Sequence, residues 1–248
     1  MTDPRPDETR APLPPGVYLV ATPIGNLEDV SARQARVLRE CDVVACEDTR
    51  HTGLLLSRLG IRRPLVSYHE HNEAARAEQL AARAAEGGRV AVVTDAGTPG
   101  ISDPAYRVVR AAVERGVAVV PVPGPSAVVA ALSASGLPTD RFAFEGFLPQ
   151  KGEKRRRRLE ALLEEERTVV LYESPHRAAR LAAEVAALAP GRPVALAREL
   201  TKLHEEFVRG TAQEVAEELG KRTVRGECVF LIGPKRMEEE EEEKEGNP

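Results

Sequence analysis

The chain has 248 residues, a formal net charge of −4 and 42% hydrophobic residues, enough for one large or two smaller domains with buried cores. Only 4% of the residues are aromatic and Trp is absent, so the core must be built from Val, Leu, Ile and Ala, which favours helices packed on sheets. No apolar span is long enough for a membrane helix, and the polar, Pro-rich start lacks the apolar region of a signal peptide. We therefore expect a soluble, cytoplasmic protein with no membrane partner.

Charge is concentrated at particular places. The segment 237–248 holds seven Glu and one Lys, which leaves the remaining chain at +2. We expect this segment to be an acidic disordered tail, and residues 1–15 to be a flexible N-terminal arm. The three cysteines (Cys41, Cys46, Cys228) match neither a disulfide framework nor zinc spacing, so buried free thiols are expected.

The first half alternates short apolar strands with helices. Strands are predicted at 17–22, 42–47, 64–68, 89–95 and 117–121. Helices are predicted from a Ser31 cap to about 41, over the leucines of 54–59, in an Ala-rich stretch ending near 86, at 105–116 and after 127. Strands that alternate with helices and are apolar throughout predict a largely parallel sheet with both faces covered.

The amino-acid composition changes at 134–149, where Gly, Pro and three of the five Phe residues occur. We interpret this segment as a domain crossover, after which the second half begins. Helices follow at 151–166, at 175–188 and before the last strand; strands are predicted at 168–173, 193–200, 205–211 and 227–233. More strands are consecutive here, which predicts a mixed sheet. The expected fold is α/β, with an N-terminal α/β domain at 16–136 and a C-terminal α/β domain at 137–236.

Gly/Pro-rich loops follow the carboxyl ends of four strands, at 22–29, 95–103, 121–127 and 173–177. Ligands bind at those ends in open α/β sheets. Gly97, Gly100 and Gly124 allow close backbone approach or positive φ. One such loop alone is an ordinary tight turn, but several at one sheet edge indicate a ligand site. GxGxxG, Walker and GxSxG motifs are absent, which disfavours dinucleotide, NTPase and hydrolase functions.

Five segments, in order, carry a resemblance: LVATPIGNLEDVSARQARVLRECDVVACEDTRHT, SYHEHNE, VVTDAGTPGISDP, VPVPGPSA and LYESPHR. From about 17 to 233 the chain resembles the ribosomal RNA small subunit methyltransferase I family, a branch of the tetrapyrrole-methylase-like (class III) methyltransferases. The resemblance implies two α/β domains with a cofactor cleft between them, S-adenosyl-L-methionine (SAM) as cofactor, and a homodimer. It further implies 2′-O-methylation of a cytidine in the decoding region of 16S rRNA, with 16S rRNA or the 30S ribosomal subunit as partner.

The same motifs imply the cofactor contacts, from both halves of the chain. These are Pro23, Asp95, Ala96, Gly97, Ile101, Ser126, Ala127, Tyr172 and Ala197. Stiff loops can hold adenine and methionine groups through backbone N–H and C=O groups without a phosphate site. A carboxylate such as Asp95 can face ribose hydroxyls or the cationic sulfonium, although capping of the following turn is a competing role.

Two polar clusters at strand ends, EDTRHT and SYHEHN, are the candidate catalytic groups. A ribose hydroxyl is a weak nucleophile, so a general base is expected. We expect Glu47 or His69 as the base and Arg50 as a phosphate or substrate anchor; the alternative is that these clusters are helix caps and structural pairs. No metal site is expected, since His69 and His71 have no third ligand at suitable spacing.

The run KGEKRRRR places six basic residues in eight positions at the start of a helix. It predicts an RNA-phosphate patch with salt-sensitive binding; a solvated helix face paired with the following Glu-rich stretch is the alternative. The residues concerned are Lys151, Lys154, Arg155, Arg156, Arg157 and Arg158. With few aromatic residues, extensive base stacking is not expected.

Two other functions remain open. One is a tetrapyrrole or protein-histidine methyltransferase of the same superfamily, against which the basic run and the EDTR and SYHEHN motifs argue. The other is a non-catalytic RNA-binding ribosome-assembly factor, against which the intact cofactor loops argue.

Overall fold

The computed structural model describes residues 11–235, which divide into two compact units, the first ending at Pro125 and the second beginning at Ser126. The expected boundary lay after 136. Helix α5 (Ala127–Ala134) lies on the other side of the division because it packs against strand β10 (Cys228–Ile232) of the second unit. The acidic tail and residues 1–10 of the expected arm lie outside the described residues.

Residues 11–15, expected to be flexible, are instead attached to the first unit. The Leu13 side chain packs against the core, and its backbone N–H donates to Glu40. The Tyr18 hydroxyl donates to the carbonyl of Pro14.

The first unit is a five-stranded sheet in the order β3-β2-β4-β1-β5, with every pairing parallel, as predicted. Its strands are β1 (Gly16–Val20), β2 (Val43–Cys46), β3 (Leu65–Ser67), β4 (Arg89–Val92) and β5 (Val119–Val122). Its helices are η1 (Leu27–Asp29), α1 (Ala32–Glu40), α2 (Thr49–Arg58), α3 (Glu73–Ala85) and α4 (Tyr106–Glu114). Ser31 caps α1 in a capping box with Gln34, which confirms the predicted start.

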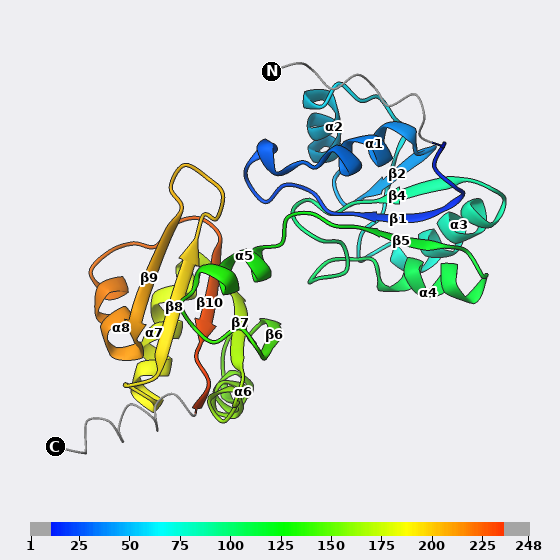
Figure 1. Cartoon of the computed structure of the whole chain (residues 1–248). Helices are drawn as coiled ribbons and strands as arrows, with labels where there is room; N and C mark the ends of the chain where they lie inside the picture. Colours follow the sequence, from blue (N-terminus) through cyan, green and yellow to red (C-terminus); the bar gives the residue numbers. More distant parts are fainter. Residues whose placement is uncertain (1–10, 236–248) are drawn as a thin grey trace. The chain divides into compact units, whose positions relative to one another are not determined.

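Both faces of this sheet are covered, which explains its uniformly apolar strands (Figure 1). Alternate residues of β4 point to opposite faces: Val90 packs with α3 and α4, and Ala91 with α1 and α2. Since neither face meets water, the parallel strands carry no polar alternation.

The second unit is a mixed sheet in the order β6-β7-β10-β8-β9, in which only β6 and β7 pair in parallel. Its remaining strands are β6 (Phe142–Phe147), β7 (Thr168–Glu173), β8 (Pro193–Arg198) and β9 (Glu206–Thr211). Its remaining helices are α6 (Glu153–Leu163), α7 (Pro175–Leu188) and α8 (Ala212–Gly220). Helices α7 and α8 pack on one another, and their apolar residues share a core with the sheet (Figure 1).

Strand β6 was not predicted, because its segment reads as a Gly/Pro-rich crossover. A β-bulge between Phe144 and Gly146 breaks the alternation that would have identified it. The three cysteines are buried and free, as expected. Among the described helices, none combines the length and apolar character that crossing a bilayer requires.

Candidate functional site

Three loops of the first unit are hydrogen-bonded to one another at the carboxyl edge of the sheet. Strand β1 lies between β4 and β5, so the loops that follow these strands are neighbours. Thr22 and Gly97 exchange backbone hydrogen bonds of 2.8 and 3.0 Å, and the Thr22 hydroxyl donates to the Thr94 carbonyl. The Thr98 hydroxyl donates to the Pro125 carbonyl. The predicted convergence of Gly/Pro-rich loops is therefore present.

The glycines of these loops are needed for two different reasons, positive φ and close packing. Gly97 and Gly100 have φ of 87° and 85°, the left-handed region that favours glycine. Gly124 instead allows close packing within the protein: a Cβ there would lie 2.0 Å from the Nε2 of the buried Gln34.

The loop after β4 carries most of the predicted first-unit contacts. Asp95 is half-buried, Ala96 is exposed, Gly97 is buried and Ile101 is exposed. Pro23, half-buried, follows the Thr22–Gly97 bridge directly, so these residues gather at one place. The Asp95 carboxylate accepts a hydrogen bond from the Asp48 N–H at 3.3 Å. It therefore links the loops after β2 and β4 rather than capping its own turn.

A cluster of carboxylates surrounds Thr94 at this edge. The Thr94 hydroxyl donates to Glu47. Burial raises the pKa of Asp103 to about 6; the Thr94 hydroxyl lowers it, and the charges of Glu47 and Asp95 raise it further. Sequence reasoning missed Thr94 and Asp103. Ser102, at φ 67°, provides a positive-φ turn immediately before Asp103. The cluster has the chemistry to bind a cation or hydroxyl donors.

The EDTRHT cluster is in part structural. Asp48 caps α2 by accepting from the backbone N–H groups of Arg50 and His51, as the alternative interpretation proposed. The Arg50 side chain is 93% exposed, and its Nε lies 3.7 Å from Asp48 Oδ1. Its guanidinium is therefore available to an external anion.

The SYHEHN cluster holds a histidine with an unsatisfied atom. His69 is half-buried; its Nε2 lies 3.4 Å from Asn72 Nδ2, and its buried Nδ1 has no hydrogen-bond partner. Its ring meets that of His71 edge-on, with centroids 5.8 Å apart. Among the described residues, no group of three His, Cys, Asp or Glu side chains is arranged for a metal ion.

In the second unit, the sheet register aligns two of the predicted residues. Val229 of β10 pairs with Tyr172 of β7 on one side and with Ala197 of β8 on the other. Ala197 is fully buried and Tyr172 half-buried. Ser126 and Ala127 begin α5, with Ser126 as an N-cap that makes no side-chain capping bond.

Backbone strain and unsatisfied polar atoms concentrate in the loops that follow strands. Within residues 11–235, the non-glycine residues with positive φ are Ser102, Glu199 and Thr201. The buried side-chain atoms without a hydrogen-bond partner in this range are Asp29 Oδ2, His69 Nδ1 and Thr201 Oγ1. Such features cluster at active sites and ligand clamps, so they mark candidate sites. The loop after β8 contains both kinds and is fastened by Lys202, which donates to Glu199 and Glu227.

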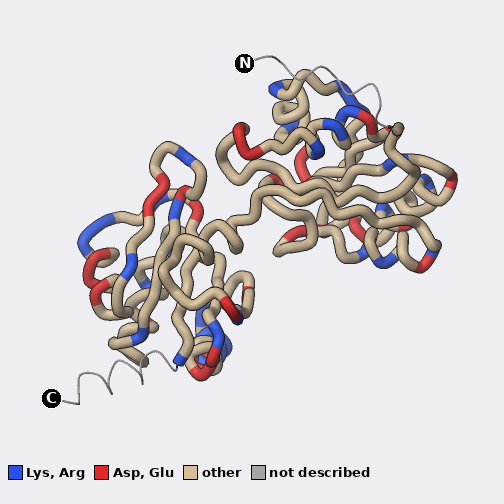
Figure 2. Tube along the Cα trace, in the orientation of Figure 1, with Lys and Arg blue, Asp and Glu red and all other residues tan. Residues whose placement is uncertain are grey.

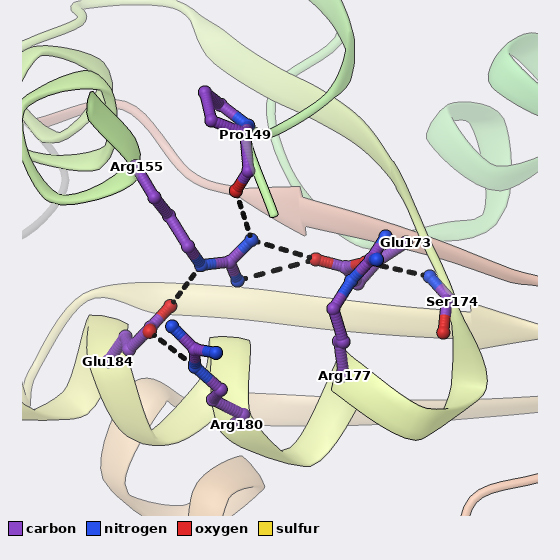
Figure 3. A network of polar contacts seen from close by, with 7 residues as sticks. All are labelled: Pro149, Arg155, Glu173, Ser174, Arg177, Arg180 and Glu184. Carbon is purple, nitrogen blue, oxygen red and sulfur yellow. Dashed lines mark hydrogen bonds and ion pairs between the residues drawn. The ribbon is translucent and has the colours of Figure 1, made fainter. Parts of the chain in front are cut away.

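The basic run does not form the continuous surface patch that its sequence predicts. Arg155 is only 1% exposed, so the prediction that it contacts RNA is wrong. Its guanidinium donates to Glu173 and Glu184 and to the carbonyl of Pro149, while Glu173 also accepts from Arg177 (Figure 3). A buried charge needs this pairing. Arg155 therefore ties α6 to β7 and α7.

The other arginines of α6 are exposed but paired. Arg156 and Arg157 both bind Glu153, one turn before, and Arg158 binds Glu145 of β6. Figure 2 shows the acidic residues lying beside the basic ones along this helix. Pairing within the helix and with β6 thus neutralises more of the run than predicted. Lys151 and Lys154 are exposed and have no carboxylate partner within the described part of the chain.

Comparison with known proteins agrees with this architecture. Residues 16–216 match the family Tetrapyrrole (Corrin/Porphyrin) Methylases. A solved cobalt precorrin-4 methyltransferase, CbiF, has a TM-score of 0.63 at 19% identity and covers 88% of this chain and 94% of its own. A uroporphyrin-III C-methyltransferase from Thermus thermophilus has a TM-score of 0.58 at 26% identity, with coverage of 88% and 93%.

Two bacterial relatives are much closer in sequence, and both are named Ribosomal RNA small subunit methyltransferase I. The protein of Mesorhizobium japonicum is 50% identical over 225 residues, which are 90% of this chain and 76% of the relative. That of Escherichia coli O157:H7 is 48% identical over 230 residues, 91% of this chain and 80% of the relative. From these matches, the chain belongs to the tetrapyrrole (corrin/porphyrin) methylases and, within them, to the ribosomal RNA small subunit methyltransferase I family.

Proposed function

We propose that this protein is a SAM-dependent methyltransferase that acts on small-subunit rRNA and methylates the 2′-hydroxyl of a cytidine in the decoding region of 16S rRNA. The family is SAM-dependent, and relatives near 50% identity carry the rRNA methyltransferase name. The observation that carries the proposal is the joined set of loops at the carboxyl edge of the first sheet, with its carboxylates and strained backbone. Because the proposed substrate is rRNA, we expect the protein to act in the cytoplasm.

The chemistry of these loops fits SAM. The cofactor presents ribose hydroxyls, a sulfonium and an ammonium group, all of which carboxylates and carbonyls bind. Asp95 lies in the acidic cluster, and Gly97 holds the loop after β4 against that after β1. When bound, SAM supplies an electrophilic methyl group. We assign its binding to Pro23, Asp95, Ala96, Gly97 and Ile101 in the first unit and, by resemblance, to Ser126, Ala127, Tyr172 and Ala197 in the second.

Glu47 and His69 are the two candidates for the base that accepts the proton of the ribose hydroxyl. Glu47 is half-buried and held by the Thr94 hydroxyl, so its orientation is fixed. His69 is half-buried, and within the described residues its Nδ1 has no hydrogen-bond partner, so the protein does not use both ring nitrogens. Arg50, exposed at the start of α2, is suited to a substrate phosphate.

The decisive experiment is transfer of tritium from methyl-labelled SAM to 30S subunits that lack this modification, followed by nuclease mapping of the labelled nucleoside. Free 16S rRNA, run in parallel, identifies the preferred substrate. A labelled 2′-O-methylcytidine in the decoding region is the expected product. Label on a base, or none on either RNA, contradicts the assignment. SAM binding by calorimetry separates the outcomes further, because a protein that binds RNA but not SAM is an assembly factor.

Variants assign the roles. The replacement that removes the base, Glu47→Gln or His69→Ala, should lower the single-turnover rate by about 10²- to 10⁴-fold while SAM affinity is retained. The variant of the residue that is not the base should keep a single-turnover rate within a few-fold of wild type, and it serves as the control for the other variant. Arg50→Gln should raise KM for the 30S subunit more than it lowers kcat. If neither Glu47→Gln nor His69→Ala slows the chemical step, both base assignments are wrong.

Two further parts of the proposal concern assembly and RNA contact. We propose a homodimer by resemblance, which sedimentation equilibrium tests directly: a monomeric mass at micromolar concentration contradicts it. For RNA phosphates we keep the exposed cations Lys151, Lys154, Arg156, Arg157 and Arg158, without Arg155. Lys151 and Lys154 should contribute most, because the three arginines already have carboxylate partners.

A further inference from the structure

One face of the second sheet collects most of the protein's phenylalanines. Leu171, Leu196 and Phe230 belong to the core that the sheet shares with α7 and α8. Because successive strand residues point to opposite faces, Tyr172 and Ala197 face the other way. Across the strands, Phe147 registers with Tyr172, and Phe207 with Ala197. Residues in register point to the same face, so these aromatic rings lie on the side opposite α7 and α8.

Phe147 and Tyr172 form a cluster with Phe144, which pairs with Val170 of β7; we call these three rings the aromatic patch. The Tyr172 ring centroid lies 5.0 Å from that of Phe144 and 5.6 Å from that of Phe147. Phe147 is 58% exposed, although it is one of the most apolar side chains of the protein. It lies on β6, an edge strand, where an exposed apolar ring favours association with a partner.

Positive charge lies at both ends of β6. Arg141 precedes the strand and Lys151 follows it, and both are exposed. Within residues 11–235 neither cation is paired with a carboxylate. Each cation can take one phosphate, although Asp140 stands next to Arg141 and Glu145 of β6 is already paired with Arg158.

The buried ion pair connects the patch to this charge. Arg155 binds Glu173, the residue after Tyr172, and also holds the carbonyl of Pro149, which lies between Phe147 and Lys151 (Figure 3). The segment that joins the exposed ring to the exposed lysine is thus fastened to the end of β7. A ring and a cation fixed in this way on one short segment can contact a base and its phosphate together.

We propose that the aromatic patch is a stacking site for an unpaired nucleobase of RNA, with Phe147 as the ring that receives it and Lys151 on an adjoining phosphate. This inference rests on the proposed rRNA substrate and names a subsite of it. Sheet faces with exposed aromatic residues bind single-stranded RNA by stacking, whereas the bases of a duplex are already stacked on one another. The patch therefore selects a splayed-out nucleotide, and the low aromatic content did not exclude stacking because the few rings are gathered.

The absence of Trp from the sequence provides a clean probe. Phe147→Trp places the one tryptophan of the full-length protein in the patch. Tyr106→Trp is the matched control, since Tyr106 is 70% exposed on α4 in the first unit. A single-stranded cytidine oligonucleotide should quench the fluorescence of Phe147→Trp and leave that of Tyr106→Trp unchanged, and a duplex of equal length should quench neither variant.

A second pair of variants measures affinity. Phe147→Leu keeps an apolar side chain without a ring and should weaken binding of the single strand about tenfold, the loss of one stacked base. Tyr106→Leu should change that affinity less than twofold, and both variants should bind SAM as the wild type does.

Other results overturn the inference. Quenching of the Phe147→Trp variant by SAM alone makes the patch a site for the cofactor's adenine, and quenching that depends only on protein concentration makes it an interface between two copies. Equal quenching of both tryptophan variants, or wild-type RNA affinity for Phe147→Leu, also excludes stacking at Phe147. Methyl transfer by the wild type to 30S subunits is measured separately. If the wild type transfers the methyl group although stacking is excluded, only the subsite is wrong. If the wild type transfers none, the proposed function fails.

Discussion

Gly124→Ala should loosen the candidate site through a single buried amide. The added Cβ would lie 2.0 Å from Gln34 Nε2 and 3.0 Å from the Cβ of Ala21. Gln34 is 1% exposed and bonded at both ends: its Nε2 donates to the Ala21 carbonyl at 2.7 Å, and its Oε1 accepts from the Ser31 N–H. The amide therefore joins the end of β1 to the start of α1 and packs against the loop after β5.

The size of the effect follows from those bonds. Gly124 is not in the left-handed region, so alanine brings no backbone strain, and the clash is the main cost. Gln34 can avoid the methyl group only by turning away, which leaves the buried Ala21 carbonyl without a partner, whereas the N–H of the exposed Ser31 can turn to water. An unpaired buried carbonyl costs about 1–3 kcal/mol, so we expect a loss of about 1–3 kcal/mol in the free energy of unfolding. SAM affinity should fall as well, because the loops after β1 and β5 lose their common anchor.

Urea unfolding of a double-mutant cycle with Gln34→Ala tests the cause. Once the amide is absent the methyl group has room, so Gly124→Ala should then cost less than about 1 kcal/mol. Gly220→Ala is the control: no heavy atom lies within 4 Å of its Cβ position, and its stability should match the wild type. If Gly124→Ala costs the same with and without Gln34, the clash is not the cause and the reasoning is refuted.

Three other predictions use stability and RNA affinity. Arg155→Leu should lower the free energy of unfolding by about 3 kcal/mol, because the buried Glu173 is left with Arg177 as its one remaining cation and loses the partner on α6. The exposed Arg156→Ala should change it by less than about 0.5 kcal/mol, and equal urea midpoints for the two variants contradict the prediction. The pKa of Asp103 is raised to about 6, so the folded protein keeps a proton that the unfolded chain releases above about pH 4, and stability falls as pH rises through this window. Asp103→Asn should remove that dependence and gain about 1–2 kcal/mol at pH 7 after solvent screening is allowed for; parallel pH profiles for variant and wild type argue against it. Lys151→Gln with Lys154→Gln should reduce the salt slope of single-stranded RNA binding by about 1.4, measured by filter binding, and an unchanged slope excludes these phosphate contacts.

Local signals identified much of the site. The loops after β1, β4 and β5 were predicted because glycine and proline follow apolar strands, and hydrogen bonds between Thr22 and Gly97 confirm that two of them meet. Asp103 was missed although its loop was predicted, because its raised pKa comes mainly from burial, which the local sequence does not show. The charge of Asp95, at the start of the same loop, adds to it, and so does that of Glu47, which lies on a segment brought near by folding.

In the arginine run, sequence reasoning assigned a role to a residue that does not have it. Four consecutive arginines read as one positive surface, yet the helix turns Arg155 inward to Glu173 while its neighbours stay outside. The deciding partner, Glu173, is 18 residues away, at the end of another strand. Residue type predicted the charge, but only the long-range contact determined which charge is free.

By itself, the sequence determined the alternation of strands and helices, the parallel first sheet, the mixed second sheet and the edge at which the Gly/Pro-rich loops meet. Each depends on hydrophobic periodicity or on turn chemistry, which act over a few residues. Tertiary structure alone decided the edge strand β6, the burial of Arg155 and the gathering of Phe147 with Tyr172. These depend on strand register and on partners distant in the chain, which no local pattern encodes.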